Sequence, residues 1–257
     1  MTEYTYRIMH KLCYLLISLV LFALPNYANA KSILEKADQK CVKQNLNKKE
    51  RENCLHMYKK AVQRHPESYE ANWKMARACR AYAVYAKRNK QEDWQNICKN
   101  YGKKCIHYAK KAIEKEPEKV QGHFYYGLCI DSYSKGISIL TAINQGLKDK
   151  AQKHFSKAYS LNKNYLYGAP VLALACMWDR LPWPLRDKQK ALKYYQEAEK
   201  IVPKGNRVRT KLQLNMGNFL LQTGKNKKKA IRMLKRATHS NSTYFAESAR
   251  EILDKYQ

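Results

Sequence analysis

The sequence predicts an all-α protein, a right-handed α-solenoid of about five helix pairs with insertions and a C-terminal capping helix. Glycine and proline are scarce, with 9 and 7 among 257 residues, and they fall between apolar-periodic segments of helical length. No stretch shows the sustained alternation of apolar and polar residues that is typical of a half-buried strand. One spacing of small and bulky residues recurs along the chain, and such recurrence indicates a repeat architecture.

The first 30 residues are expected to form a secretory signal peptide, which leaves residues 31–257 as the repeat domain. Two basic residues precede the apolar run Leu12–Leu24, and the small-residue pattern Ala28-Asn29-Ala30 follows it. This order is typical of a cleaved leader. The run is shorter than the roughly 20 residues of a membrane helix, although an uncleaved anchor is the alternative. Because Lys31 rather than cysteine follows the cleavage site, we expect a periplasmic or secreted protein without a lipid anchor.

The recurring pattern places a small residue, a bulky residue four positions later, an alanine three positions further on, and a proline or polar residue after five more. Its copies are Cys54, Tyr58, Ala61, Pro66; Cys105, Ala109, Ala112, Pro117; Ala151, Phe155, Ala158, Lys163; Ala191, Tyr195, Ala198, Pro203; and Ala230, Leu234, Ala237, Ser242. Offsets of four and three lie on one stripe of a helix, where small residues let a neighbouring helix approach. Proline ends such a helix because it lacks an N–H.

This pattern resembles the second helix of a tetratricopeptide repeat, a motif of 34 residues. Counting back in that frame finds a small residue at the close-contact position of the first helix, namely Ala76, Gly127 and Ala173. The terminal repeats depart from the pattern with Val42 and Gln213. The resemblance covers nearly the whole predicted repeat domain, and it implies stacked helix pairs with a concave, protein-binding groove.

The repeats are longer than 34 residues, and the extra residues fall between the two helices of each pair. In the second repeat they include the polar stretch Lys87–Gly102. In the third they are Ser132–Lys148, which we expect to form an extended amphipathic helix, and in the fourth the loop Leu181–Asp187. Phe245–Tyr256 is expected to be the closing helix that covers the last apolar face.

The proline-rich loop narrows the resemblance. Leu181, Pro182, Trp183, Pro184 and Asp187 resemble a Leu-Pro-Gly-Trp-Pro-x-Gly-Asp loop found in a bacterial branch of these proteins. That branch is associated with TRAP-type solute transporters of the periplasm, so the resemblance implies a transporter solute-binding subunit as partner. One glycine of the pattern is missing, an arginine replaces the other, and the lipidation cysteine common in that branch is absent.

The charge of the chain favours a negatively charged partner. It has 50 Lys and Arg against 21 Asp and Glu, a formal net charge of +29. Such a field attracts acidic proteins, anionic headgroups or polyanions, although a solvated surface without any ligand is the alternative. Export makes a nucleic-acid partner unexpected.

The cysteines outside the leader are Cys41, Cys54, Cys79, Cys98, Cys105, Cys129 and Cys176. An exported protein is expected to pair some of them, and their odd number leaves at least one unpaired. Cys41 and Cys54 fall on paired helices of the first repeat and are a candidate disulfide. Cys79 with Cys98 or Cys105 would tie down the second insertion, and the remaining two are expected to be buried free thiols.

The sequence offers no catalytic, cofactor or metal-binding motif, so we do not expect an enzyme. The groove-facing positions of the repeat frame are Trp73, Arg77, Arg80, Phe124, Leu128, Asp131, Tyr167, Leu174 and Met177. Aromatic and arginine side chains are typical of binding hot spots, and arginine pairs with carboxylates, so an acidic or C-terminal peptide is a candidate ligand. The alternative is that the aromatic residues pack under the insertions. Trp183 is either an exposed contact or, as we favour, a buried residue of a loop that folds back.

The leading functional hypothesis is a non-enzymatic, exported scaffold that binds an extracytoplasmic protein or peptide, as an accessory to a TRAP-type transport system. One alternative is a scaffold for assembly of the envelope or of a secretion machine. Another is a binder of a small hydrophobic or anionic ligand beneath the third insertion. Self-association through the amphipathic insertion is also open.

Overall fold

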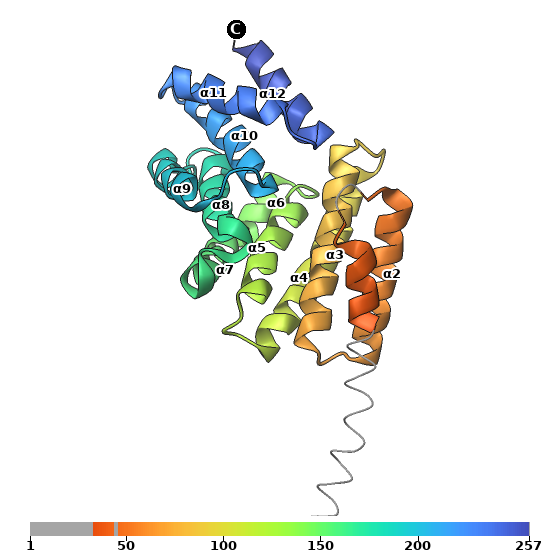
Figure 1. Cartoon of the computed structure of the whole chain (residues 1–257). Helices are drawn as coiled ribbons and strands as arrows, with labels where there is room; N and C mark the ends of the chain where they lie inside the picture. Colours follow the sequence, from red (N-terminus) through yellow and green to blue (C-terminus); the bar gives the residue numbers. More distant parts are fainter. Residues whose placement is uncertain (1–32, 44–45, 257) are drawn as a thin grey trace, which may run out of the picture.

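The computed structural model describes residues 33–43 and 46–256, and this part of the chain is helical without a strand. The predicted leader, residues 1–30, lies outside the described residues. After a helix at residues 33–41 come the helices labelled in Figure 1: α2 (Lys48–Arg64), α3 (Tyr69–Arg88), α4 (Trp94–Lys115), α5 (Val120–Ser134), α6 (Ile139–Asn144), α7 (Leu147–Asn162), α8 (Tyr165–Arg180), α9 (Lys188–Ile201), α10 (Arg207–Gln222), α11 (Lys227–Thr238) and α12 (Thr243–Lys255).

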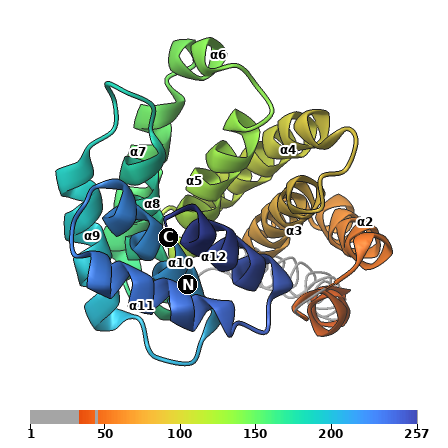
Figure 2. The ribbon, with the colours of Figure 1, turned by 90° about the horizontal axis from the view of Figure 1, so that it is seen from above.

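The helices pack as successive pairs, which confirms the predicted repeat architecture. The helix at 33–41 is joined to α2 by the Cys41–Cys54 disulfide and by the hydrogen bond from Tyr58 to Asp38. The later pairs are α3 with α4, α5 with α7, α8 with α9, and α10 with α11, while α12 packs on α11 at the end. Seen from above, α3, α5, α8 and α10 lie toward the middle of the array, and α2, α4, α7, α9 and α11 form its outer layer (Figure 2). The first helices of the second to fifth pairs therefore line the inner face, as the tetratricopeptide resemblance implies.

The recurring alanine of the sequence pattern is the contact point of each pair. Ala61, Ala112, Ala158, Ala198 and Ala237 are each at most 1 % exposed. A methyl side chain at these sites lets the paired helices approach closely while still burying apolar surface. The pattern thus identifies the core stripe of each second helix.

Glycine takes the same role on the first helices of the third and fifth pairs. A Cβ atom on Gly127 would lie 2.6 Å from the Phe155 ring, and one on Gly217 would lie 2.8 Å from the Leu234 side chain. The repeat frame places Gln213 at the contact position of the fifth pair. The small residue is instead Gly217, one turn further along α10.

The second insertion, Lys87–Gly102, lies mostly within α3 and α4 and lengthens both helices. The third insertion differs from its prediction. Ser132–Lys148 is not one extended helix, because α5 ends at Ser134 and the short α6 is separate from α7. Ser138 caps α6 by accepting from the Thr141 N–H at 3.1 Å, and Gly146 turns the chain with a φ of 60°.

The proline-rich loop presents its tryptophan to solvent, so the favoured prediction of a buried Trp183 is wrong. Trp183 is 90 % exposed, whereas Trp178 in the preceding helix is buried. Lys190 lies 4.4 Å from the centroid of the Trp178 ring. Arg186 holds the loop in place by donating to Asp179 at 2.5 Å.

Two disulfides join paired or adjacent helices. The predicted Cys41–Cys54 bond is present, with its Cα atoms 5.6 Å apart. Cys105 bonds to Cys129, with Cα atoms 5.4 Å apart. The expected pairing of Cys79 with Cys98 or Cys105 is therefore wrong, as is the free thiol expected at Cys129, because α4 packs against α5 with Cys105 beside Cys129, and Cys79 and Cys98 are free.

Thiol labelling tests these bonds. Protein comprising residues 31–257, unfolded without reductant, is expected to react with iodoacetamide only at Cys79, Cys98 and Cys176, which are free and buried in the folded chain. Replacing both members of either bonded pair by serine is expected to lower the free energy of unfolding by about 3 kcal/mol, because the unfolded chain is no longer held in a closed loop and gains conformational entropy. Mass spectrometry and urea denaturation measure the two effects. Alkylation at a bonded position of the untreated protein would contradict the assignment.

A histidine pair, in which His123 is buried and His154 half-buried, joins α5 to α7. The Nδ1 atoms of His123 and His154 lie 2.9 Å apart, and His123 Nε2 lies 2.9 Å from the Pro117 carbonyl oxygen. If His123 donates to that carbonyl through Nε2, its Nδ1 accepts from His154. Burial, followed by the neighbouring His123 and Lys153, lowers the pKa of His154 to about 4.

The histidine pair predicts that the fold weakens in mild acid. An unfolded histidine binds a proton below pH 6.5, whereas folded His154 stays neutral until about pH 4, so protons favour the unfolded chain between these values. Stability is expected to be complete above pH 7 and to fall by about 2 kcal/mol as the pH drops to 4, since partial exposure moderates the effect. Urea unfolding at several pH values measures it. His154→Gln should remove the His154 contribution, and His107→Gln on exposed α4 surface should leave it unchanged.

Candidate binding surface on the inner face

The helix array curves enough to bring its two ends together. The Arg88 guanidinium of α3 lies 4.1 Å from the Tyr244 ring centroid and 5.2 Å from that of Phe245, both on α12. Arg207 of α10 lies 5.8 Å from the Phe245 ring. The inner surfaces of α3 and α10 therefore face one another although they belong to different ends of the array (Figure 2).

Positive side chains converge on this inner face from three helices. We define the inner cationic cluster as Arg80 of α3, Arg180 of α8, and Arg207 and Lys211 of α10. Arg180 and Arg207 are exposed, and Arg80 and Lys211 are half-buried. The latter two are surrounded by protein and still reach solvent, as expected on a concave surface.

The electrostatics show how crowded the cluster is. Burial, and then Arg80 and Arg180, lower the pKa of Lys211 to about 8, against opposing effects of Cys176 and Asp131. Burial is also the main cause of the lowered pKa of Arg80, to which Arg207 and Arg180 contribute. The charged forms of Arg80 and Lys211 are therefore destabilised by burial and by neighbouring cations. The pKa of Arg180 is raised instead, chiefly by Cys176, with contributions from Asp131 and Tyr195 that outweigh its burial.

Asp131 of α5 is an acidic side chain beside the cluster, and it is already paired. Its Oδ2 atom accepts from Lys135 Nζ at 2.5 Å. Burial alone would raise the pKa of Asp131, but Lys135, Arg180 and Arg80 outweigh it and hold this pKa well below its usual range. One carboxylate that is committed to Lys135 leaves most of the positive charge of the cluster unbalanced.

The hydrogen bonds of the cluster are also incomplete. Arg180 donates to the Asn215 side-chain oxygen at 2.6 Å. Arg80 Nε is buried and has no hydrogen-bond partner among the described residues. A buried donor without a partner costs about 1–3 kcal/mol, so an incoming acceptor at Arg80 would be stabilised.

Two residues predicted for the groove belong to a network at the N-terminal end. Arg77 donates to Asp38 at 2.8 Å and to the Tyr58 hydroxyl at 2.7 Å. Trp73 stacks on Tyr125 with ring centroids 5.6 Å apart, and Arg77 lies over the Trp73 ring at 5.1 Å. Arg77 thus joins the first helix pair to the second, and Trp73 joins the second to the third, so both side chains are engaged within the chain.

Three other predicted groove residues are core residues. Phe124, Leu128 and Leu174 are 4 %, 7 % and 1 % exposed. They fill the contact between neighbouring helices, and Phe124 meets Tyr165 edge-on at 5.5 Å. Their side chains are therefore not available to a partner, which corrects that part of the prediction.

The remaining four predicted groove residues lie in different environments. Arg80 belongs to the inner cationic cluster and Asp131 lies beside it. Met177 is half-buried against the hydrophobic core, and Tyr167 is 61 % exposed. Tyr167 lies within a left-handed run from Leu166 to Gly168 at the start of α8. No described contact connects Tyr167 to the cluster.

The positions of the tetratricopeptide repeat, from which the groove residues were predicted, did not identify Arg180, Arg207 or Lys211. A single repeat gives the face of each residue, but it does not give the curvature that brings α10 opposite α3. One signal was present: the chain has no Asp or Glu between Glu199 and Glu247. This acid-free stretch contains Arg207 and Lys211.

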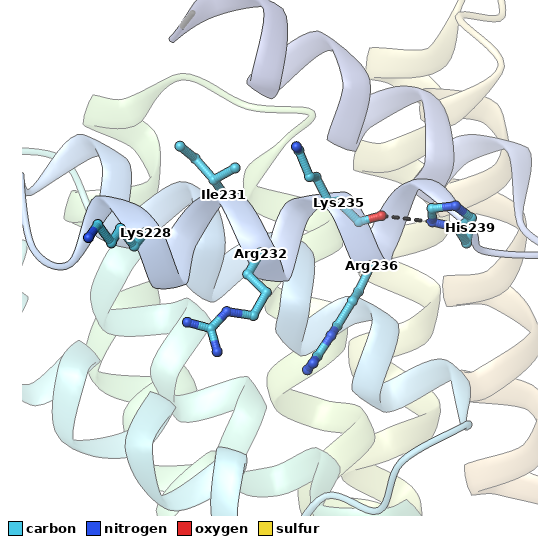
Figure 3. A pocket seen from close by; sticks show the side chains of 6 residues that line it. All are labelled: Lys228, Ile231, Arg232, Lys235, Arg236 and His239. Atoms are coloured by element: carbon cyan, nitrogen blue, oxygen red, sulfur yellow. Dashed lines mark hydrogen bonds between the residues drawn. The ribbon is translucent and has the colours of Figure 1, made fainter.

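The same stretch produces a second basic surface on the outer layer. Lys228, Arg232, Lys235 and Arg236 are exposed on α11 around the half-buried Ile231, and they line a shallow depression (Figure 3). Figure 3 also shows the ring of His239, whose Nδ1 lies 2.9 Å from the Lys235 carbonyl oxygen. These side chains are solvated, so they are a matched comparison for the inner cluster.

In the described residues, no group of three or more His, Cys, Asp or Glu side chains is arranged to hold a metal ion. No described helix has the length and apolar character needed to cross a membrane.

The architecture defines the class as tetratricopeptide-like helical-repeat proteins. The crystal structure of TTC0263, a tetratricopeptide protein of Thermus thermophilus, superposes with a TM-score of 0.64 at 13 % sequence identity, covering 87 % of this chain and 98 % of that one. At this identity the likeness shows the fold alone.

Within that class, the family model described as Regulator of microtubule dynamics protein 1-3 matches residues 33–169, a little over half of the sequence. The chain belongs to this family. It is 26 % identical over 153 residues to Regulator of microtubule dynamics protein 1 of Mus musculus, covering 53 % of this chain and 47 % of that protein. The Pongo abelii protein of the same name is 26 % identical over 192 residues, covering 68 % of this chain and 56 % of its own length.

This chain thus spans about half the length of the curated relatives that it matches. The relatives are named for microtubule regulation, and the transporter-associated branch suggested by the loop Leu181–Asp187 stays a prediction.

Proposed function

We propose that this protein is a non-catalytic scaffold that binds an acidic segment of a partner protein on its inner face. The observation that carries the proposal is the inner cationic cluster, in which Arg80, Arg180, Arg207 and Lys211 converge around one committed carboxylate. Helical-repeat proteins use such curved surfaces for binding. Complementary charge brings specificity and fast association.

An extended acidic peptide fits this surface better than a folded acidic domain does. Arg80 and Lys211 are enclosed by several helices, so a partner must reach them with a narrow element. Arginine can bind a carboxylate through two parallel hydrogen bonds. The exposed Arg180 and Arg207 provide that geometry beside the enclosed pair.

The cellular setting is a second part of the proposal. The order of basic residues, apolar run and small residues in 1–30 supports export to the periplasm or outside the cell. N-terminal sequencing of protein recovered from its native cells tests this proposal. A new N-terminus near Lys31 is expected, and a mature protein that keeps Leu12–Leu24 would contradict it.

Two candidate partners follow from different observations. The loop Leu181–Asp187 supports a TRAP-type solute-binding subunit, and the names of the curated relatives support a microtubule-associated role. A co-sedimentation assay with assembled microtubules and a pull-down with a nearby-encoded solute-binding protein separate the two. Binding to either through the inner face agrees with a scaffold.

The scaffold proposal itself is tested with a defined probe. A fluorescent, N-acetylated twelve-residue peptide rich in Glu and Asp is expected to bind the protein, and its Gln and Asn counterpart is not. Binding should weaken as salt is raised, because screening acts on the charged contacts. Equal affinity for the two peptides in fluorescence anisotropy would sink the proposal.

A further inference from the structure

Lys211 is the lysine of the inner cationic cluster, and its amine has no bonded partner. It is half-buried on α10, where its backbone carbonyl accepts from the Asn215 side chain at 2.6 Å, but no hydrogen bond or ion pair joins its Nζ atom to another described residue. Arg80 comes toward it from α3 and Arg180 from α8, while Asp131 of α5 and the Cys176 thiol of α8 also act on it. Two of these neighbours are cations at all relevant pH values.

The carboxylates that could neutralise Lys211 are used elsewhere. Asp131 accepts from Lys135 at 2.5 Å. On the adjacent helices, Asp179 is paired with Arg186 and Glu199 with Lys229, which lies 2.6 Å away.

A half-buried ammonium group without a counter-charge has two ways to lower its free energy. It can lose its proton, or it can take up an anion from outside. In the unbound protein, burial, Arg80 and Arg180 favour loss of the proton, since they lower the pKa of Lys211 to about 8. A carboxylate placed beside the amine stabilises the charged form and raises this pKa again.

We propose that Lys211, flanked by Arg80 and Arg180, anchors a carboxylate of the partner's acidic segment, and that in alkaline solution this binding takes up a proton. The inference rests on the proposed function and adds the anchoring residue and the regulation of the same surface. The proton moves from solvent to the Lys211 amine as the carboxylate arrives, so the product is an ammonium–carboxylate pair.

The coupling between protonation of Lys211 and peptide binding determines how strongly the affinity depends on pH. If binding restores Lys211 to an ordinary lysine pKa of roughly 10.4, the affinity falls about tenfold between pH 7 and pH 9. At pH 8 about half of the unbound molecules lack this proton, so binding takes up about 0.5 proton per peptide, and at pH 6.5 almost none. A surface of ordinary, fully charged lysines has no such uptake in this range.

Calorimetry with the acidic twelve-residue peptide measures the uptake. Titrations at pH 8 in phosphate and in Tris, whose ionisation enthalpies differ, give the protons exchanged per peptide, and the same pair at pH 6.5 gives the reference. Lys211→Arg should keep the affinity and lose the uptake, because arginine stays charged. Lys211→Met should bind about tenfold more weakly at pH 7 and also lose the uptake. Lys228→Met on α11 should behave as wild type.

Asp131→Asn supplies a variant whose predicted effect has the opposite sign. It removes the acidic side chain beside the cluster while keeping a similar shape, so peptide affinity should rise several-fold. Damage to the fold would lower the affinity instead, which separates the two effects.

The outcomes distinguish the inference from the proposed function. If the acidic peptide binds neither the wild-type protein nor any of the variants, the proposed function fails. If the peptide binds and Lys211→Arg shows the same proton uptake as wild type, Lys211 is not the anchor, while the scaffold proposal stands.

Discussion

Replacing Gly102 by valine is expected to lower the free energy of unfolding by about 3 kcal/mol or more, the largest stability change that we predict for a single substitution. A Cβ atom at this position of α4 would lie 2.6 Å from the Cα atom of Tyr133 and 2.8 Å from its backbone N on α5. Backbone atoms cannot rotate away as the end of a side chain can, so the two helices must separate. Chemical denaturation followed by circular dichroism measures the loss.

The sign of the alanine variant is the sharper part of this prediction. Helix propensity alone makes Gly102→Ala stabilising by about 1 kcal/mol, whereas the close approach of α5 makes it destabilising. Lys103→Ala, on the exposed neighbour in the same helix, is the matched control and should change little. A stabilised Gly102→Ala would show that α4 and α5 do not pack as closely as described.

Reversing the two exposed charges of the inner face is expected to weaken binding of the acidic peptide about 100-fold or more. In Arg180→Glu/Arg207→Glu, each substitution replaces an attraction by a repulsion, and each is expected to cost at least a factor of ten, or about 1.4 kcal/mol. Both side chains are exposed, so the fold should be retained. Fluorescence anisotropy at low and moderate salt measures the affinities.

The matched control is Lys228→Glu/Arg232→Glu on α11, which changes the net charge by the same amount on the outer layer (Figure 3). It should weaken binding only slightly, through the overall field. Equal losses in the two double variants would mean that the peptide responds to net charge alone and that the inner face has no special role.

The sequence predicted the pairing of helices well because that pairing depends on local spacing. Each recurring alanine, from Ala61 to Ala237, is a contact within one helix pair, and all are buried as expected. The Cys41–Cys54 bond could be predicted for the same reason, since both residues belong to one pair. The Cys105–Cys129 bond joins α4 to α5 of the next pair, and a frame built on single repeats does not give that contact.

The candidate site was harder to predict because it depends on the curvature of the whole array. Arg80 and Asp131 were identified from their positions in the repeat. Lys211 belongs to the cluster only because α10 comes round to face α3. Phe124 shows the opposite error, since the repeat frame put it on the surface, while the tyrosine and phenylalanine side chains around it bury it.

The third insertion was mispredicted for a local reason. Apolar spacing in Ser132–Lys148 suggested a continuous helix, but Gly136 packs so tightly that a Cβ atom there would meet the α4 backbone, and α5 ends just before it. Ile139, Leu140 and Ile143 consequently stand exposed on the separate α6.

Photo-cross-linking is the most direct test of the claim that the inner face is the binding surface. An acidic peptide carrying a benzophenone group at its centre is irradiated with the folded protein, and the attached residues are mapped by mass spectrometry. We predict attachment on α3, α8 and α10, around Arg80, Arg180 and Lys211. Attachment confined to α11 or α6 would contradict the claim.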